Sequence, residues 1–150
     1  MKADKRILIG AAIAALLAFG LMQFWPQNLT NPTITATPEW DSERTKTLAE
    51  QACFDCHSNE TEWPWYAHVI PAGILLEKDV LDGRKILNFS QWEETCCSLP
   101  QIDDMAATVN KREMPPPYYI ILHPDADLND TERGELVNGL IKTMNAEIGN

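Results

Sequence analysis

The chain has 150 residues, enough for one ordinary domain and a short appendage, with 22 Asp and Glu against 12 Lys and Arg. Residues 1–25 hold three of the basic residues and one acidic residue, which leaves 9 basic and 21 acidic residues beyond them, a net charge of −12. Such an acidic surface repels DNA and anionic lipid headgroups, so it argues against nucleic-acid binding and favours partners with basic surfaces.

The first segment is typical of a membrane anchor. Three basic residues at positions 2–6 precede an uncharged apolar run over residues 7–25. As a helix this run extends roughly 28 Å, close to the ~30 Å hydrocarbon core of a bilayer. The charge asymmetry predicts a single-pass protein of the inner (cytoplasmic) membrane, with the following domain in the periplasm or extracytoplasmic space. A cleaved signal peptide is the alternative, because its charge layout is the same.

The next segment, residues 26–40, is polar, rich in threonine and interrupted by prolines, which predicts a flexible tether. Residues 41–150 then form the exported domain. Asp41 or Ser42 can cap a helix whose narrow apolar face consists of Leu48, Ala49 and Ala52. That helix runs directly into a cysteine-containing motif.

The motif is Cys53-Phe54-Asp55-Cys56-His57, two thiols three positions apart with a histidine directly after the second. This spacing is the attachment pattern of c-type haem, in which the two sulfurs add to the haem vinyl groups. His57 is then the proximal iron ligand. A zinc site or a dithiol redox centre shares the Cys-x-x-Cys part alone, and the histidine in an exported chain favours one covalently attached haem c.

Two middle helices and a closing helix follow. Their apolar positions are 74, 75, 80 and 81 for the first and 102, 105, 106 and 109 for the second. The closing helix has a predicted capping box of Asn129 and Glu132, and its apolar face is formed by Leu136, Val137, Leu140, Ile141 and Met144. Because no stretch alternates as a strand does, we predict an all-α domain.

This order of elements resembles a class I cytochrome c. More closely, residues 53–140 resemble the small haem-binding domain family of membrane-anchored monohaem c-type cytochromes. Four blocks carry the resemblance: CFDCHSNETEWPWY, DGRKILNFSQW, MPPPYY followed by LHP, and LNDTERGELVNGL. The resemblance implies a helical haem fold that serves electron transfer or haem binding.

Met114 is the predicted distal iron ligand. Three prolines follow it, and their stiff extended backbone lowers the entropy that the chain loses when the sulfur binds iron. His68 and His123 are alternative sixth ligands, and an open, exchangeable position is a further one. Trp63 and Trp65 are expected to shield the haem edge.

Arg84, with the neighbouring Lys85, is expected to pair with haem propionates. Cys96 and Cys97 have no place in the haem site. They can pair with each other, link to a partner, bind a metal or stay as buried thiols.

We therefore expect a membrane-tethered electron carrier, with basic redox partner proteins, and not an enzyme. Two alternatives stay open: a haem peroxidase or gas or redox sensor with an exchangeable sixth ligand, and a fixed haem subunit of a respiratory complex. The sequence shows no glycine-rich phosphate loop and no recognisable nucleophile elbow.

Overall fold

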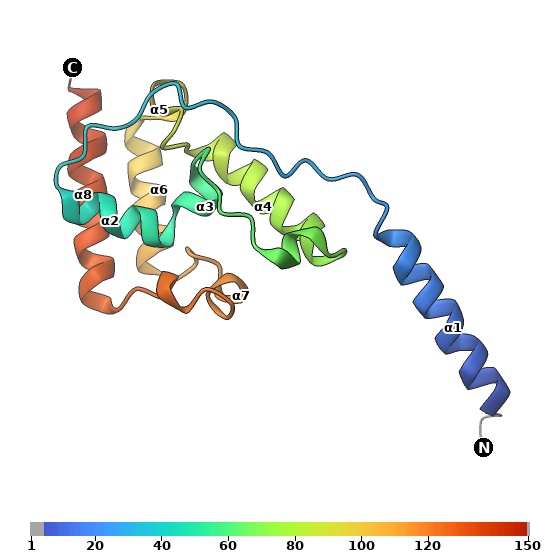
Figure 1. The fold of residues 1–150 in the computed structure, drawn as a ribbon. Coiled ribbons are helices and arrows are strands. Elements are labelled where there is room, and N and C mark those ends of the chain that lie inside the picture. Colours follow the sequence, from blue (N-terminus) through green and yellow to red (C-terminus); the bar gives the residue numbers. More distant parts are fainter. Residues whose placement is uncertain (1–4, 150) are drawn as a thin grey trace. The chain divides into compact units, whose positions relative to one another are not determined.

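The computed structural model describes residues 5–149, and the chain divides into two compact units (Figure 1). Unit 1 contains the residues up to 30 together with residues 63–79. Unit 2 contains residues 31–62 and the residues from 80 onward. Helix α4 (Ala72–Ile86) contributes its first half to unit 1 and its second half to unit 2.

Unit 1 begins with α1 (Lys5–Met22), the apolar helix that the sequence predicts. Its length and composition are sufficient to cross a membrane, and its residues are exposed throughout. The 3-10 helix η1 (Trp65–His68) and the first turns of α4 complete this unit.

Unit 2 is built from helices, and no strand occurs among residues 5–149 apart from an isolated bridge between Ala36 and Gln91. The prediction of an all-α domain is therefore confirmed. Besides the second half of α4, the helices are α2 (Glu43–Ala52), α3 (Phe54–His57), α5 (Trp92–Thr95), α6 (Leu99–Asn110), α7 (Pro117–Ile120), η2 (Pro124–Ala126) and α8 (Asp130–Ile148).

The helix caps follow the sequence signals. The Ser42 side chain accepts a hydrogen bond from the backbone N–H of Thr45 and so caps α2. At α8 the predicted capping box is present, because Asn129 accepts from the first-turn backbone and Glu132 accepts from the N–H of Asn129. The Ser42 cap and the capping box both satisfy backbone donors that a helix N-terminus leaves without partners.

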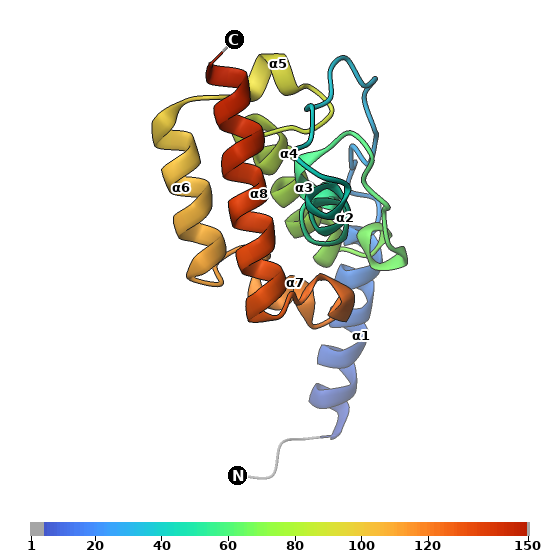
Figure 2. The ribbon, with the colours of Figure 1, turned by 90° about the vertical axis from the view of Figure 1, so that its left-hand side faces the viewer.

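Helices α2 and α6 both pack against α8, which lies beside α6 in both views (Figures 1 and 2). The predicted apolar faces of α2 and α8 are buried here, with Leu48, Leu140 and Met144 at most 1 % exposed. At the crossing of α2 and α8, a Cβ on Gly139 would collide with the buried side chain of Thr45. The absence of a side chain at Gly139 therefore sets how closely the two helices approach.

Two features differ from the sequence predictions. Ile74 and Leu75, expected on the apolar face of α4, are 39 % and 49 % exposed, whereas Val80 on the same helix is fully buried. The buried side of α4 runs through Leu76 and Val80, which are one turn apart, and Ile74 and Leu75 lie outside it. The short helix α7 was not predicted; it begins at Pro117, a position where proline costs no helical hydrogen bond.

The helix crossing gives a first prediction. Gly139→Ala should lower the free energy of unfolding by about 1–3 kcal/mol, because the added methyl group overpacks against Thr45. Gly134→Ala in the same helix is the matched control, since a Cβ there meets no atom within 4 Å. That control should stabilise α8 by up to ~1 kcal/mol through helix propensity. Urea unfolding followed by circular dichroism distinguishes the two, and equal stability of both variants would contradict the proposed close contact.

Candidate functional site

The motif Cys53–His57 forms one helical turn at the end of α2. The backbone N–H of His57 donates to the carbonyl oxygen of Cys53 at 2.9 Å, and that of Cys56 donates to the same oxygen at 3.2 Å. Neither Cys53 nor Cys56 is in a disulfide. The fold therefore brings the two thiols and the imidazole together on a single turn, α3, as the spacing of the motif requires.

The His57 ring is held by the backbone that follows α4. Its Nδ1 lies 2.9 Å from the carbonyl oxygen of Leu87. A carbonyl can only accept, so Nδ1 carries the proton and the lone pair of the neutral ring is on Nε2. Burial lowers the pKa of His57, while hydrogen bonding to the Leu87 and Gly83 carbonyls acts in the opposite direction. A histidine that donates one ring N–H to a backbone carbonyl is oriented for metal binding through the other nitrogen.

The segment from Leu87 to Ser90 anchors the motif a second time. The N–H of Phe89 donates to the carbonyl oxygen of His57 at 2.7 Å. The fully buried amide of Asn88 donates to Asn59 and accepts from the N–H of Ser90, whose hydroxyl in turn accepts from the N–H of Asn59. Both the ring and the main chain of His57 are thus fixed by one short loop.

Helix α4 packs directly on the motif at Gly83. A Cβ at this position would collide with the carbonyl oxygen of Cys56, so only glycine allows the approach. At the next residue, the guanidinium of Arg84 donates to the carbonyl of Ser58 at 2.7 Å and to the side chains of Asn31 and Thr61. These bonds hold the chain that leaves the motif. Pairing of Arg84 with a haem propionate stays a prediction.

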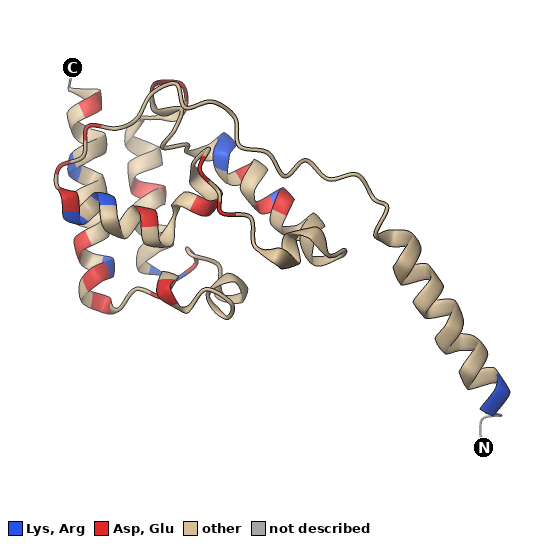
Figure 3. Cartoon of the chain, viewed as in Figure 1, with Lys and Arg blue, Asp and Glu red and all other residues tan. Residues whose placement is uncertain are grey.

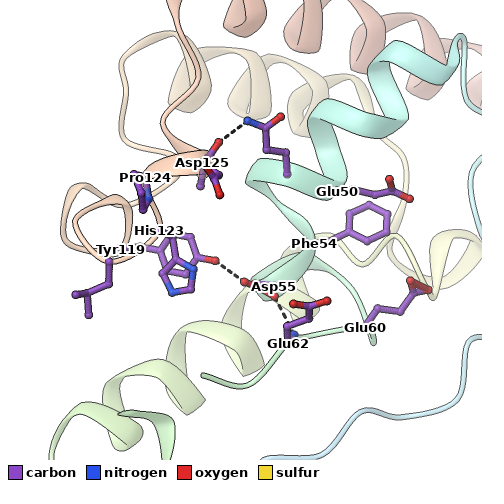
Figure 4. Close-up of a pocket in the computed structure, with 12 residues that line it drawn as sticks. Glu50, Phe54, Asp55, Glu60, Glu62, Tyr119, His123, Pro124 and Asp125 are labelled. Atoms are coloured by element: carbon purple, nitrogen blue, oxygen red, sulfur yellow. Dashed lines mark hydrogen bonds between the residues drawn. The ribbon is translucent and has the colours of Figure 1, made fainter. Parts of the chain in front are cut away.

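The two variable residues of the motif have structural roles. The Phe54 ring stacks on Phe89 with ring centroids 5.3 Å apart, inside an aromatic cluster that also contains Trp40 and Trp92. The carboxylate of Asp55 accepts hydrogen bonds from the N–H of Glu62 and from the hydroxyl of Tyr119 in α7 (Figure 4). Tyr119 lies shortly after Met114, so Asp55 connects the cysteine motif to the methionine segment.

Met114 lies between α6 and α7 with 40 % of its surface exposed. Its N–H donates to the carbonyl of Thr108, and its own carbonyl accepts from the guanidinium of Arg133 at 3.0 Å. The segment is therefore attached to the end of α6 and to α8. Met114 belongs to the same unit as Cys53 and His57, and its role as the distal iron ligand stays a prediction.

Arg133 is a site residue that sequence reasoning missed. It is only 5 % exposed, and its guanidinium donates to the carbonyls of Val109, Met114 and Leu128. Its buried Nε–H has no hydrogen-bond partner within residues 5–149. Burial raises the pKa of Cys53 to about 12, and the nearby positive charge of Arg133 opposes that shift. The available signal for Arg133 in the sequence was its place, one turn before the apolar positions of the closing helix.

The remaining predicted residues are distributed over both units. Trp63, Trp65 and His68 belong to unit 1, so their relation to the haem stays a prediction. In unit 2, His123 stacks on Tyr119 with centroids 4.0 Å apart. Cys96 and Cys97 form a disulfide with each other and pack against the core. They are not part of the haem attachment motif.

A pocket of about 470 Å³ opens beside α3 (Figure 4). It is strongly acidic, with carboxylates from Glu50, Asp55, Glu60, Glu62 and Asp125. The pocket is not lined by Cys53, Cys56 or His57. Within residues 5–149, no group of three or more His, Cys, Asp and Glu is arranged to hold a metal ion.

A family model described as "Haem-binding domain" matches residues 17–142. No curated protein and no solved structure matches the chain.

The buried guanidinium gives a second prediction. Arg133→Gln should lower the free energy of unfolding by about 1.5–3 kcal/mol, because buried carbonyls lose a charged donor. Arg44→Gln is the control, since Arg44 pairs with Glu132 and Glu135 at the surface and should matter little. Chemical unfolding of both variants provides the measurement. A stable Arg133→Gln variant would mean that the carbonyls find other donors.

Proposed function

Because the chain belongs to the haem-binding domain family, we propose that it is a monohaem c-type cytochrome that carries electrons. In this proposal α1 tethers the protein to the inner membrane, and the haem domain lies in the periplasm. The family supports haem in general. The covalent attachment, the ligands and the role in electron transfer are inferences from the residues described above.

The orientation of His57 carries the proposal. Its Nδ1–H is used by the carbonyl of Leu87, which leaves Nε2 for iron, and the two thiols of the attachment motif lie on the same turn. Cys53 and Cys56 would hold the haem through thioether bonds. When bound, haem supplies a one-electron iron couple. The carbonyl of Leu87 would hold the imidazole in one orientation, because a backbone acceptor does not rotate as a side chain does.

Met114 is proposed as the distal ligand. Its main chain is restrained on both sides, by the carbonyl of Thr108 and by Arg133, and the prolines that follow restrict it further. Restraint before binding lowers the entropy cost of ligation. Methionine with histidine raises the reduction potential relative to two histidines, which suits an electron carrier more than an enzyme with an open sixth position.

The charge of unit 2 supports a role in protein-to-protein electron transfer. This unit carries 19 Asp and Glu against 8 Lys and Arg, and many of the acidic positions lie on exposed helices (Figure 3). An electrostatic field of one sign accelerates encounter with partners of the opposite sign. We therefore propose basic redox proteins as donor and acceptor.

Covalent attachment is tested by cysteine replacement. In the double variant Cys53→Ser/Cys56→Ser, haem should no longer stay with the polypeptide after denaturing electrophoresis. The control Cys96→Ser/Cys97→Ser uses the other two cysteines and should keep its haem stain. A pyridine haemochrome spectrum of the unaltered protein should show thioether-linked haem. Vinyl-type haem in that spectrum would end the assignment to the c type.

The sixth ligand is tested by replacing Met114. In oxidised Met114→Ala the weak sulfur-to-iron charge-transfer band should be absent, and the reduced variant should bind carbon monoxide without denaturant. Met105→Ala, which removes a half-buried methionine of α6, should keep the band. If His68→Ala or His123→Ala altered the ligand spectrum and Met114→Ala did not, one of these histidines would be the ligand.

A further inference from the structure

The end of α1 is hydrogen-bonded to a part of the chain that lies far away in sequence. Gln23, the first residue after α1, donates from Nε2 to the carbonyl of Ile70 at 3.2 Å. Its Oε1 accepts from the N–H of the same residue at 3.0 Å. This reciprocal pair satisfies both backbone groups of Ile70, which is only 1 % exposed.

Two neighbouring contacts extend this attachment within unit 1. The side chain of Gln27 donates to the carbonyl of Ala67 at 2.9 Å. The N–H of Asn28 donates to the carboxylate of Glu77, also at 2.9 Å. Residues 23–28 are therefore hydrogen-bonded to residues 67–77 at three places. These bonds hold residues 67–77 beside the end of α1.

Unit 1 also differs from unit 2 in charge. No Asp, Glu, Lys or Arg occurs between Ile7 and Thr30 or between Trp63 and Leu76, and the corresponding ribbons in Figure 3 are uncoloured. Large apolar side chains are nevertheless exposed in these stretches: Phe24, Trp25, Trp65, Ile74 and Leu75. Exposed tryptophans without nearby charges are characteristic of the boundary between lipid and water.

We infer that residues 63–76, which we term the interfacial segment, bind the headgroup boundary of a zwitterionic lipid bilayer. The inference rests on the proposed anchoring of the chain by α1. If α1 spans the hydrocarbon core, Gln23 emerges at its surface, and Ile70 lies within hydrogen-bonding distance of Gln23. The interfacial segment then meets the lipid at the same depth and inserts Trp65, which is 78 % exposed. The membrane contact of this protein therefore includes a second, peripheral element from the middle of the chain.

The test uses the full chain, loaded with haem, in phosphatidylcholine nanodiscs. A photoreactive benzoylphenylalanine replaces Trp65, Trp25 or Leu99, one position at a time. Leu99 is the matched control, because it is apolar and 64 % exposed but belongs to unit 2. After irradiation, mass spectrometry should find phospholipid adducts at positions 25 and 65, with at least several-fold less adduct at position 99.

The outcomes separate this inference from the anchoring on which it rests. Adducts at position 25 without adducts at position 65 would overturn the inference and leave the anchor intact. Absence of adducts at position 25 would overturn both. Equal yields at positions 65 and 99 would show that lipid contact is not particular to the interfacial segment, and would also overturn it.

A second variant tests the attachment itself. Gln23→Ala removes both hydrogen bonds to Ile70 and should reduce the adduct yield at position 65 several-fold. The yield at position 25 should not change, because the variant keeps every residue of α1 and removes only one side-chain bond to it, the one to the carbonyl of Phe19. An unchanged yield at position 65 would show that Gln23 does not hold the interfacial segment at the membrane.

Discussion

A single hydrogen bond from an imidazole to a backbone carbonyl organises the haem-binding unit. It determines which nitrogen of His57 is free, and its acceptor, Leu87, belongs to the loop that directly follows α4. The same loop binds the main chain of His57 through Phe89 and closes a buried network through Asn88. Because the acceptor is part of the main chain, the orientation of the ring depends on the path of the loop and on the packing of α4 at Gly83.

The segment around Met114 is held by hydrogen bonds within the same unit. Arg133 donates to it from α8, and Tyr119 connects it to Asp55 of the cysteine motif. The closing helix therefore does more than complete the core, because it also delivers a buried cation to the loop. The charge of Arg133 acts on Cys53, so if haem is bound there as proposed, this charge would favour the reduced state of the iron, as a methionine ligand would.

The features that sequence could predict are those with local signals. The helix caps at Ser42 and Asn129 and the all-α class depend on neighbouring residues, and the structure confirms them. The acceptor at Leu87 could not be predicted, since a backbone carbonyl has no signature in a sequence. The burial of Arg133 could not be predicted for a related reason. Whether an arginine on an amphipathic helix is buried depends on the segments that pack over it. The exposure of Ile74 was missed because several apolar residues lie close together at the start of α4, and periodicity did not show that Leu76, and not Ile74, shares the buried side with Val80.

The packing of Phe54 has a consequence for how the protein matures. In the closed fold its half-buried ring packs in the aromatic cluster, and α4 contacts Cys56 at Gly83, so the motif is packed against the core. If haem is attached to both thiols as proposed above, the turn would have to be accessible when the thioether bonds form. Attachment would then precede closure of the helical domain.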